Sequence, residues 1–533
     1  MMFSKSLIAQ IQADDSIGAG NFYEAIMALP VDLHKTVLSI DKTIPLYAGQ
    51  QTHFSFNDIQ QIVYQVASKY CALGVSEGDL VGLYLDDGLS YFLHYLALNR
   101  LGAIPVCIND KLPADTVLAF CKSTNVGVLI HDDDKEAALK ASAEADSPLV
   151  NINKLMVLCS QSIPPAKSFT ADDVVLLAHT SGTTGIPKAV TFTQHSFFFG
   201  VKSQLHKQQG SKVLSALPHS HSSAISVLMS SLLRGAEIYL LSDKRPDHLI
   251  HSIKKYQHDL IIAFPKTYVD LCKQPLVAED FTSVNYWIAT GDANHESHIR
   301  KLISLGQHYI NNQPQPGSVF IDNLGSSEFG FAMFRNIHSL KTNRFNRCIG
   351  KPFSWVEAAI LSENGQILPA GKIGKLGVKS GTVTAGYWNN KQLTEEAQLA
   401  GYWLTGDLAY FDSSGLFYHV DRTSDPIDTC DGTIYSCQTE ELILSHFKDV
   451  FECSIYSGPS IDNDAYSVAH ICVELIADAE LILDFELLNQ INHLLRSHHI
   501  PALTSLEFQA SNAHTGVTGK KLKRRLRQLR EVA

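Results

Sequence analysis

The apolar positions in the first part of the chain follow two periods in alternation. In residues 56–73 they recur at the spacing of one helical face, as Phe56, Ile59, Ile62, Val63, Val66, Tyr70 and Leu73. A compact apolar run, DLVGLYL at 79–85, comes next and has the length typical of a buried strand. The pattern therefore predicts a helix followed by a strand.

The same alternation continues further along the chain. Helical patterns at 89–103 and 113–123 are separated by strand-like runs at 104–109 and 126–131. Parallel strands need crossover connections that are usually helices, so this order predicts an α/β fold with mostly parallel sheets. The alternation of helical and strand-like patterns changes after about residue 420. There a helix at 439–447, strands at 451–457 and 467–476, and a helix at 485–497 predict a small α+β domain.

The boundary between these two parts is expected near DRTSDP at 421–426, where polar residues and a proline interrupt the pattern. We therefore expect a large domain of mostly parallel sheets at 1–422 and a small lid domain at 423–533.

Composition excludes several classes of protein. With 533 residues, 45% hydrophobic and 18% charged, the chain is expected to be globular with more than one domain. A net charge of -11 argues against a general nucleic-acid binder. The 10 cysteines form no CxxC pair, and the spacing of Cys430 and Cys437 is unlike that of zinc ligands. Neither a signal peptide nor a long apolar span is evident, so we expect a soluble cytoplasmic protein with reduced thiols.

The segment HTSGTTGIPK at 179–188 lies between two strand-like runs, VVLLAH and AVTFT. Glycines allow backbone N–H groups to converge on an anion, and the Ser and Thr hydroxyls add donors. A triphosphate is the expected ligand, although loops of this composition are also common as simple turns. The spacing differs from that of the nucleotide P-loop, which disfavours a P-loop kinase or GTPase.

Six segments in this order resemble the adenylate-forming superfamily, which includes acyl- and aryl-CoA ligases, peptide-synthetase adenylation domains and luciferases. They are TSGTTGIPK at 180–188, LPHSH at 217–221, GSSE at 325–328, GYWNN at 386–390, WLTGDLAYFDSSGLFYHVDR at 403–422 and GVTGKKLKRRL at 516–526. The resemblance spans nearly the whole chain. It implies an N-terminal adenylation core at 1–422 and a mobile C-terminal lid at 423–533.

The resemblance also implies two half-reactions. A carboxylate attacks the α-phosphate of ATP bound with Mg²⁺, pyrophosphate leaves, and an acyl adenylate forms. A thiol, from CoA or from the phosphopantetheine of an acyl carrier protein, then displaces AMP. Such chemistry depends on positioning and electrostatic stabilisation, so cations, hydrogen-bond donors and a metal-holding carboxylate are the expected residues.

The resemblance assigns residues to these tasks. Lys188, Glu328, His221 and Lys520 are the expected catalytic residues, and Ser181 and Glu328 are the expected metal ligands. Asp407 would accept from the ribose hydroxyls, while Arg422 would add positive charge. The remaining nucleotide-binding positions are Thr180, Ser181, Gly182, Thr183, Thr184, Gly185, Lys188, Gly291, Asp292, Asn323, Leu324, Gly325, Ser326, Ser327 and Lys520. The alternative is that Asp407 and Arg422 form a surface ion pair and that Lys520 is solvated.

The residues that line the substrate pocket are expected to be small, apolar or neutral. Its candidates are His221, Ser222, Ser223, Val227, Thr290, Gly291, Leu324, Gly325 and Phe331. The segment 222–233 has no carboxylate to pair with an ammonium group, which disfavours an amino acid and favours an aromatic or apolar carboxylic acid. Leu324 replaces the aromatic residue that stacks on adenine in the family, so weaker ATP binding is expected.

Two other clusters have alternative interpretations. HSHSS at 219–223 is compatible with a metal site or a Ser/His nucleophile, but no acidic partner at a suitable spacing is evident. The resemblance instead makes His221 a wall between the substrate pocket and the thiol tunnel. The basic C-terminus places Leu522, Leu526 and Leu529 on one helical face, which favours a docked lid helix over a nucleic-acid or membrane-binding segment.

The lid departs from the family pattern around its hinge. Ser424 stands at the pivot with Asp425 next to it, and Asp431 stands where a glycine lines the thiol tunnel. Either the turn is shifted so that Gly432 takes that role, or Asp428 and Asp431 disfavour CoA and a carrier protein receives the acyl group. A catalytically degenerate protein that only binds nucleotide or acyl adenylate is the alternative to an enzyme.

Overall fold

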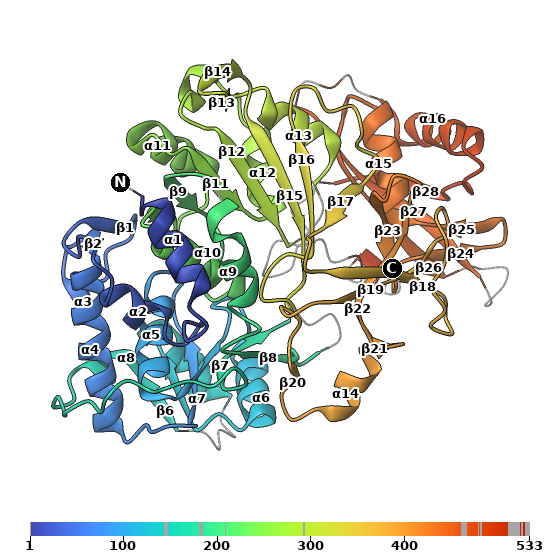
Figure 1. Ribbon diagram of the computed structural model, residues 1–533. Coiled ribbons are helices and arrows are strands. Elements are labelled where there is room, and N and C mark those ends of the chain that lie inside the picture. Colours follow the sequence, from blue (N-terminus) through green and yellow to red (C-terminus); the bar gives the residue numbers. More distant parts are fainter. Residues whose placement is uncertain are drawn as a thin grey trace.

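The computed structural model describes residues 2–142, 148–180, 185–207, 209–291, 294–459, 466–477, 479, 482–509, 523, 526 and 527. Two large sheets, with helices packed on them, form the part of the chain coloured blue to orange in Figure 1. The C-terminal elements, orange to red, lie beside the end of the larger sheet.

The first sheet has seven strands in the order β20-β8-β7-β4-β3-β5-β6. The strands β7, β4, β3, β5 and β6 are parallel, whereas β8 pairs antiparallel with both β7 and β20. Their bounds are β3 Leu80–Tyr84, β4 Ile104–Cys107, β5 Val128–His131, β6 Leu149–Asn151, β7 Val174–His179, β8 Ala189–Thr193 and β20 Gly386–Tyr387. The helices that precede and follow these strands are α4 Phe56–Leu73, α5 Ser90–Leu101, α6 Ala114–Thr124, α7 Asp133–Ala141 and α8 Ile152–Met156.

The second sheet joins a parallel half to an antiparallel half at β15. The parallel strands are β1 Thr36–Ile40, β9 Lys212–Ser215, β10 Glu237–Leu240, β11 Leu260–Ala263, β12 Tyr286–Thr290 and β15 Val319–Leu324. The antiparallel strands beyond β15 are β16 Phe334–His338, β17 Cys348–Pro352, β18 Glu357–Leu361, β19 Gly374–Lys379, β21 Gln398–Leu399, β22 Tyr402–Phe411 and β23 Phe417–Arg422. At the opposite edge, β2 His53–Ser55 pairs antiparallel with β1. A separate hairpin pairs β13 Gln307–Ile310 with β14 Gln313–Pro316.

Helices cover this sheet and connect its parallel strands. They are α9 Phe199–Gln204, α10 Ser222–Leu233, α11 Pro246–Tyr256, α12 Pro265–Cys272 and α13 Glu296–Ile303. The remaining helices are α1 Lys5–Ala13, α2 Phe22–Met27, α3 Pro45–Ala48 and α14 Lys391–Glu396. Among the described residues, no helix is long and apolar enough to cross a membrane, and the ten cysteines are free thiols.

The C-terminal elements have a hydrophobic core of their own, whose buried members all lie within residues 427–506. They comprise the hairpin β24 Ile427–Thr429 and β25 Gly432–Ile434, the three-stranded sheet β26 Val450–Pro459, β27 Ser467–Leu475 and β28 Ser505–Phe508, and the helices α15 Ser436–His446 and α16 Asp484–Ser497. The exact boundary at residue 422 stays a prediction.

The predicted α/β fold is confirmed, including the first helix. The sheets are parallel only in part, because the larger sheet is antiparallel beyond β15. Helix α4 begins after a capping box in which Ser55 and Asp58 bond each other's backbone, and it ends at Gly74 in the left-handed conformation. Six of the seven predicted stripe residues are buried, and Leu73 is partly buried. The spacing of apolar residues therefore correctly predicted which face of α4 packs on the core.

Candidate active site

The loop after β7 connects two antiparallel neighbours, β7 and β8. Its described ends meet, because the backbone N–H of Thr180 donates to the carbonyl of Lys188 over 3.1 Å. Gly185 has a φ of +134°, a conformation that L side chains rarely adopt. Residues 181–184, which include the predicted Ser181, Gly182, Thr183 and Thr184, lie outside the described residues.

Glu328 belongs to a group of side chains contributed by the loop after β15, by β20 and by the loop after β7. Its Oε2 accepts from the Ser326 hydroxyl over 2.7 Å, and its Oε1 accepts from the Tyr387 hydroxyl over 2.8 Å. The exposed Lys188 places its ammonium 5.1 Å from the centre of the Tyr387 ring. Burial, followed by the charge of Glu328, raises the pKa of Tyr387 well above its usual range, so this hydroxyl remains a donor. Tyr387 was missed at the sequence level, although GYWNN had been recognised as a motif.

Asp407 and Arg422 face each other across β22 and β23. Arg422 Nη1 lies 2.6 Å from Asp407 Oδ1, and His419 Nε2 lies 3.3 Å from the same oxygen. Asp407 is 4% exposed, whereas the Arg422 side chain is exposed, so the pair joins a buried carboxylate to a cation at the surface. Burial disfavours the charged carboxylate, but the charge of Arg422 and the hydrogen bond from His419 hold the pKa of Asp407 well below its usual range. The carboxylate has a second oxygen that can accept further hydrogen bonds.

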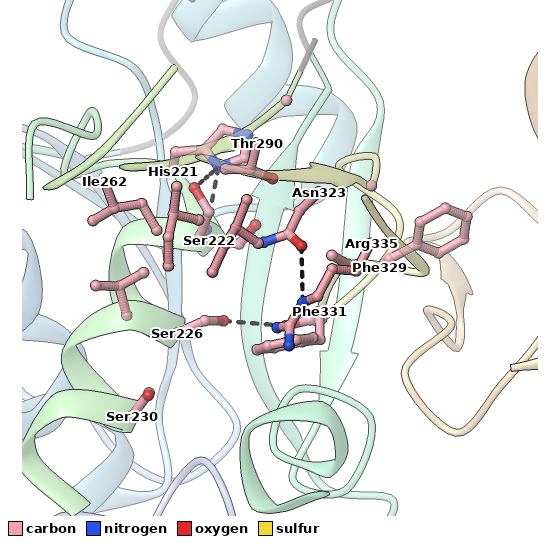
Figure 2. A pocket seen from close by; sticks show the side chains of 18 of the residues that line it. His221, Ser222, Ser226, Ser230, Ile262, Thr290, Asn323, Phe329, Phe331 and Arg335 are labelled. Carbon is pink, nitrogen blue, oxygen red and sulfur yellow. Dashed lines mark hydrogen bonds between the residues drawn. The ribbon is translucent and has the colours of Figure 1, made fainter. Parts of the chain in front are cut away.

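A cavity of about 150 Å³ lies between α10 and the strands β12, β15 and β16. Figure 2 shows α10 along one wall, with Asn323, Phe331 and Arg335 opposite it. The predicted pocket residues that line it are His221, Ser222, Ser223, Val227, Thr290, Gly291, Gly325 and Phe331, together with the predicted nucleotide-binding Asn323, Ser326 and Ser327. Leu324 does not line it; this side chain packs, partly buried, against the main core. Asp292 lies outside the described residues.

Helix α10 has a polar face toward the cavity. His221 is its N-cap, and its Nδ1 accepts from the backbone N–H of Ser223 over 3.2 Å. The His221 ring packs edge-on against Phe264, with ring centroids 5.2 Å apart. This contact holds the imidazole at the N-terminus of α10. The lining residues that sequence reasoning missed include Ser226, Ser230, Ser231, Arg234, Lys207 and Arg335. The spacing of the serines, four residues apart along α10, was the available signal.

The neighbouring His219 is engaged elsewhere. Its Nδ1 lies 2.8 Å from Asp87 Oδ1, and Lys244 contacts the other oxygen of Asp87. His219 thus has an acidic partner that the local spacing does not reveal, because Asp87 comes from a segment far away in sequence. His219 and Lys244 share the partly buried carboxylate of Asp87, so His219 belongs to this network of polar contacts.

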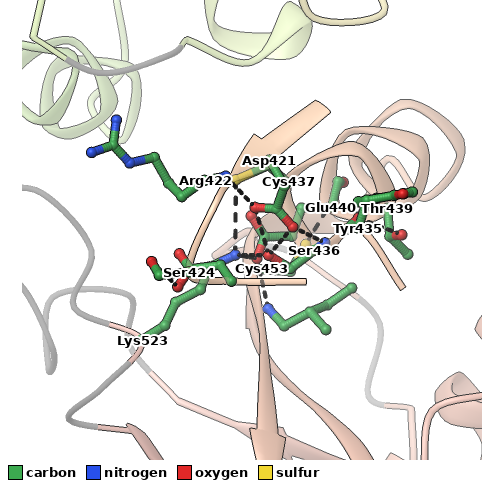
Figure 3. Close-up of polar contacts among 12 residues, drawn as sticks. Asp421, Arg422, Ser424, Tyr435, Ser436, Cys437, Thr439, Glu440, Cys453 and Lys523 are labelled. Carbon is green, nitrogen blue, oxygen red and sulfur yellow. Dashed lines mark hydrogen bonds and ion pairs between the residues drawn. The ribbon is translucent and has the colours of Figure 1, made fainter. Parts of the chain in front are cut away.

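The C-terminal elements contact the part of the chain that precedes them. His295, at the N-terminus of α13, lies 2.6 Å from Glu441 of α15, and the backbone N–H of Glu296 donates to the same carboxylate. Figure 3 shows a second network at the start of α15, where Lys523 Nζ lies 2.8 Å from Glu440 and 2.5 Å from the Ser436 hydroxyl. Lys520, Gly519, Leu522 and Leu529 lie outside the described residues, whereas Leu526 is buried against Tyr456 and Cys472.

The hairpin that departs from the family pattern turns at Cys430 and Asp431, because Thr429 pairs directly with Gly432. Gly432 has a φ of +132°, and Asp431 is not among the residues with positive φ. Asp428 and Asp431 are exposed. The position that requires a glycine is thus residue 432.

Comparisons with known proteins agree with this geometry. A profile described as AMP-binding enzyme matches residues 35–388. A 3-aminoavenalumate diazotase from Streptomyces sp is 33% identical, over 99% of this chain and 98% of that protein. A 2-succinylbenzoate--CoA ligase from Bacillus cereus is 26% identical, over 74% of this chain and 79% of that protein. An o-succinylbenzoate coenzyme A synthetase from Bacillus subtilis, in complex with ATP and magnesium ion, has a TM-score of 0.79 and 22% identity, over 95% of this chain and 99% of that one.

Proposed function

This chain belongs to the AMP-binding enzyme family, and we propose that it activates an aromatic or apolar carboxylic acid with ATP and passes the acyl group to a thiol. One observation carries the proposal: predicted nucleotide-binding residues and predicted substrate-binding residues line the same cavity. Ser326 and Ser327, which precede Glu328 in the chain, line it together with Phe331 and Thr290. An acid bound there has its reacting end beside the predicted nucleotide site.

The residues divide the first step between them. Asp407, held ionised by Arg422, is placed to accept from the ribose hydroxyls. Lys188 supplies a cation to the phosphates, and Lys520 of the lid stabilises charge at the α-phosphate when the domains close. The carboxylate oxygen of the substrate then bonds to the α-phosphorus, and pyrophosphate leaves with the bonding electron pair.

The donor set at Glu328 fits Mg²⁺. This ion prefers oxygen ligands and keeps several waters, and a carboxylate has more lone pairs than the two donors Ser326 and Tyr387 occupy. When bound, Mg²⁺ would neutralise charge on the phosphates. Tyr387 and Ser326 orient Glu328 for that role, and Ser181 is the proposed second protein ligand.

The acceptor in the second step is CoA or the phosphopantetheine of an acyl carrier protein. The thiol sulfur bonds to the acyl carbon, and AMP leaves. We place the thiol route beside the β24–β25 hairpin, where Gly432 supplies the conformation expected of the tunnel glycine. A cytoplasmic location, where ATP and CoA are available, belongs to this proposal.

Pyrophosphate release from a panel of aromatic, aliphatic and amino acids tests the first step. Hydroxylamine serves as a surrogate thiol, and a Glu328→Gln variant is the control for contaminating activity. Turnover of an aromatic or apolar acid supports the proposal. Silence across the panel, with ATP bound, would favour the degenerate binding protein.

A second candidate function follows from the 33% identity with a diazotase, which extends over 99% of this chain. In this candidate the adenylated oxyanion is nitrite. A nitrite oxygen attacks the α-phosphorus and pyrophosphate leaves. An aryl amine then attacks the nitrogen of the mixed anhydride, AMP leaves, and the nitrosamine takes up a proton and loses water to give a diazonium ion.

The two candidates differ in their co-substrates. Pyrophosphate release that requires nitrite, together with an azo dye after trapping with 2-naphthol, supports diazotisation. A thioester formed from an acid and CoA without nitrite supports the ligase. The same preparation of enzyme is used in both assays, so that an inactive protein is recognised by silence in both.

A further inference from the structure

Arg335 projects from β16 into the substrate cavity and has only neutral partners in the described part of the chain. Its Nε donates to Asn323 Oδ1 over 3.4 Å, and its Nη1 donates to Gln204 Oε1 over 3.2 Å. Its guanidinium carbon lies 4.6 Å from the centre of the Phe353 ring. None of the ion pairs found among the described residues includes Arg335.

The rest of the cavity does not compensate this charge. The described lining residues include the cations Lys207, Arg234 and Arg335, but no aspartate or glutamate. Arg234 is bound by the backbone carbonyls of Ser230, Gln209 and Gly210 at the end of α10. Arg335 is partly buried, and burial lowers its pKa. A desolvated cation without a counter-ion is costly, so an anionic ligand would recover part of that cost.

The position of Arg335 along the cavity indicates which end of a substrate it meets. Figure 2 shows Arg335 across the cavity from Ser226, which lies one helical turn, about 6 Å, beyond Ser222. His221, the N-cap of α10, lies at the other end of this helix face, and Asn323 lies between it and Arg335. A substrate that reacts near His221 therefore presents its remote end to Arg335.

We propose that Arg335 is a specificity-determining anion site, and that the substrate is an aromatic compound carrying a carboxylate at the end remote from its reacting group. This inference rests on the proposed function and names its substrate class. Under acid activation the substrate is a dicarboxylate. Under diazotisation it is an amino-substituted aromatic acid. Asn323 and Gln204 hold the guanidinium so that its remaining N–H groups bind a carboxylate in a planar fork.

A purely structural Arg335, which only orients Asn323, makes a different prediction. It would affect substrates with and without a remote carboxylate equally. The test therefore compares cinnamate with 4-carboxycinnamate, and aniline plus nitrite with 4-aminobenzoate plus nitrite. The variants are Arg335→Gln and Arg335→Lys, with Arg344→Gln, an exposed arginine outside the cavity, as the matched control.

The wild type is expected to favour the carboxylated member of the pair that it turns over. Arg335→Gln should raise KM for that member roughly 10- to 100-fold, the loss typical of a hydrogen-bonded ionic contact, with kcat little changed. The uncarboxylated member should change less than about threefold, within the range of neutral substitutions. Arg335→Lys should recover part of the loss. Equal effects on both members, or a preference for the uncarboxylated one, would overturn the inference.

A binding measurement distinguishes failure of the proposed function from failure of the proposed anion site. If neither pair is turned over, calorimetry measures binding of cinnamate and 4-carboxycinnamate to the wild type and to Arg335→Gln. Tighter binding of the dicarboxylate that disappears in Arg335→Gln supports the anion site without any catalysis. Equal or absent binding of the two acids would reject it.

Discussion

The hydroxyl of Tyr387 donates to Oε1 of Glu328 over 2.8 Å. This bond joins β20 of the smaller sheet to the loop that follows β15 of the larger sheet. Lys188 lies over the same tyrosine ring. The proposed metal ligand and the proposed phosphate cation are therefore positioned by one side chain.

Tyr387→Phe keeps the ring that packs on Trp403 but removes this donor. We expect pyrophosphate release to slow about tenfold and to require more Mg²⁺, since a hydrogen bond to a charged group is lost. The matched control is Tyr402→Phe, which removes a hydroxyl bonded to the exposed Glu357. Identical magnesium titrations for both variants would contradict the role given to Tyr387.

Asp407→Ala removes the buried acceptor paired with Arg422. ATP binding should weaken by about 1 to 3 kcal/mol, because ribose donors lose their partner. Calorimetric titration with ATP measures this loss, and Asp412→Ala, in the turn of the same strand pair, is the control. An unchanged dissociation constant in a folded Asp407→Ala protein would remove Asp407 from the nucleotide site.

Lys520→Ala should separate the two half-reactions. Adenylation should fall about 100- to 1,000-fold, as is typical when one preorganised electrostatic donor is removed. Transfer from a preformed acyl adenylate should be much less affected, because it uses another orientation of the lid. Lys521→Ala tests whether the neighbouring charge suffices, and equal loss in both steps would refute the assignment.

Gly432→Asp should block transfer to CoA while leaving pyrophosphate release nearly unchanged. The backbone at Gly432 has a φ of +132°, which is strained for any L residue, and the side chain would enter the proposed thiol route. Asp431→Gly, one residue away in the same turn, should alter transfer little. Faster CoA transfer by Asp431→Gly would show that Asp431 is the obstructing residue.

His94 is expected to shape the stability of the protein against acid. It is buried between the hydroxyls of Tyr47 and Tyr70, at 2.7 and 2.5 Å, and burial lowers its pKa to about 3. The folded state then binds fewer protons than the unfolded state, whose histidine titrates near pH 6.5. This contribution to stability is complete above about pH 6.5 and is lost as the pH falls toward about 3.

His94→Gln should flatten the dependence of unfolding free energy on pH in that window. Urea titrations from pH 7 to pH 4 measure the slope, and His53→Gln, on an exposed residue, is the control. A slope as steep in His94→Gln as in the wild type would assign the acid sensitivity to other groups.

The sequence by itself determined the elements and the family resemblance. The apolar period of 56–73 predicted α4, because a helix that packs on a core buries one continuous face. The residues of that face recur every three or four positions, so the local sequence reveals them. Asp407 and Arg422 could be assigned from motifs because they lie opposite each other on the two strands of one hairpin, within a single recognised segment. The sequence likewise limited the candidates for the tunnel glycine position to Asp431 and Gly432, of which only Gly432 is a glycine.

Only the tertiary structure decided which distant side chains meet. Asp87 became the partner of His219, Tyr387 became the partner of Glu328, and Glu441 became the partner of His295. Local spacing carries no information about such pairs, because sheet packing and domain contact bring them together. Arg335 shows the same limit for charge. Its residue type is visible in the sequence, but its desolvation and its lack of an acidic partner among the described residues depend on which side chains close the cavity around it.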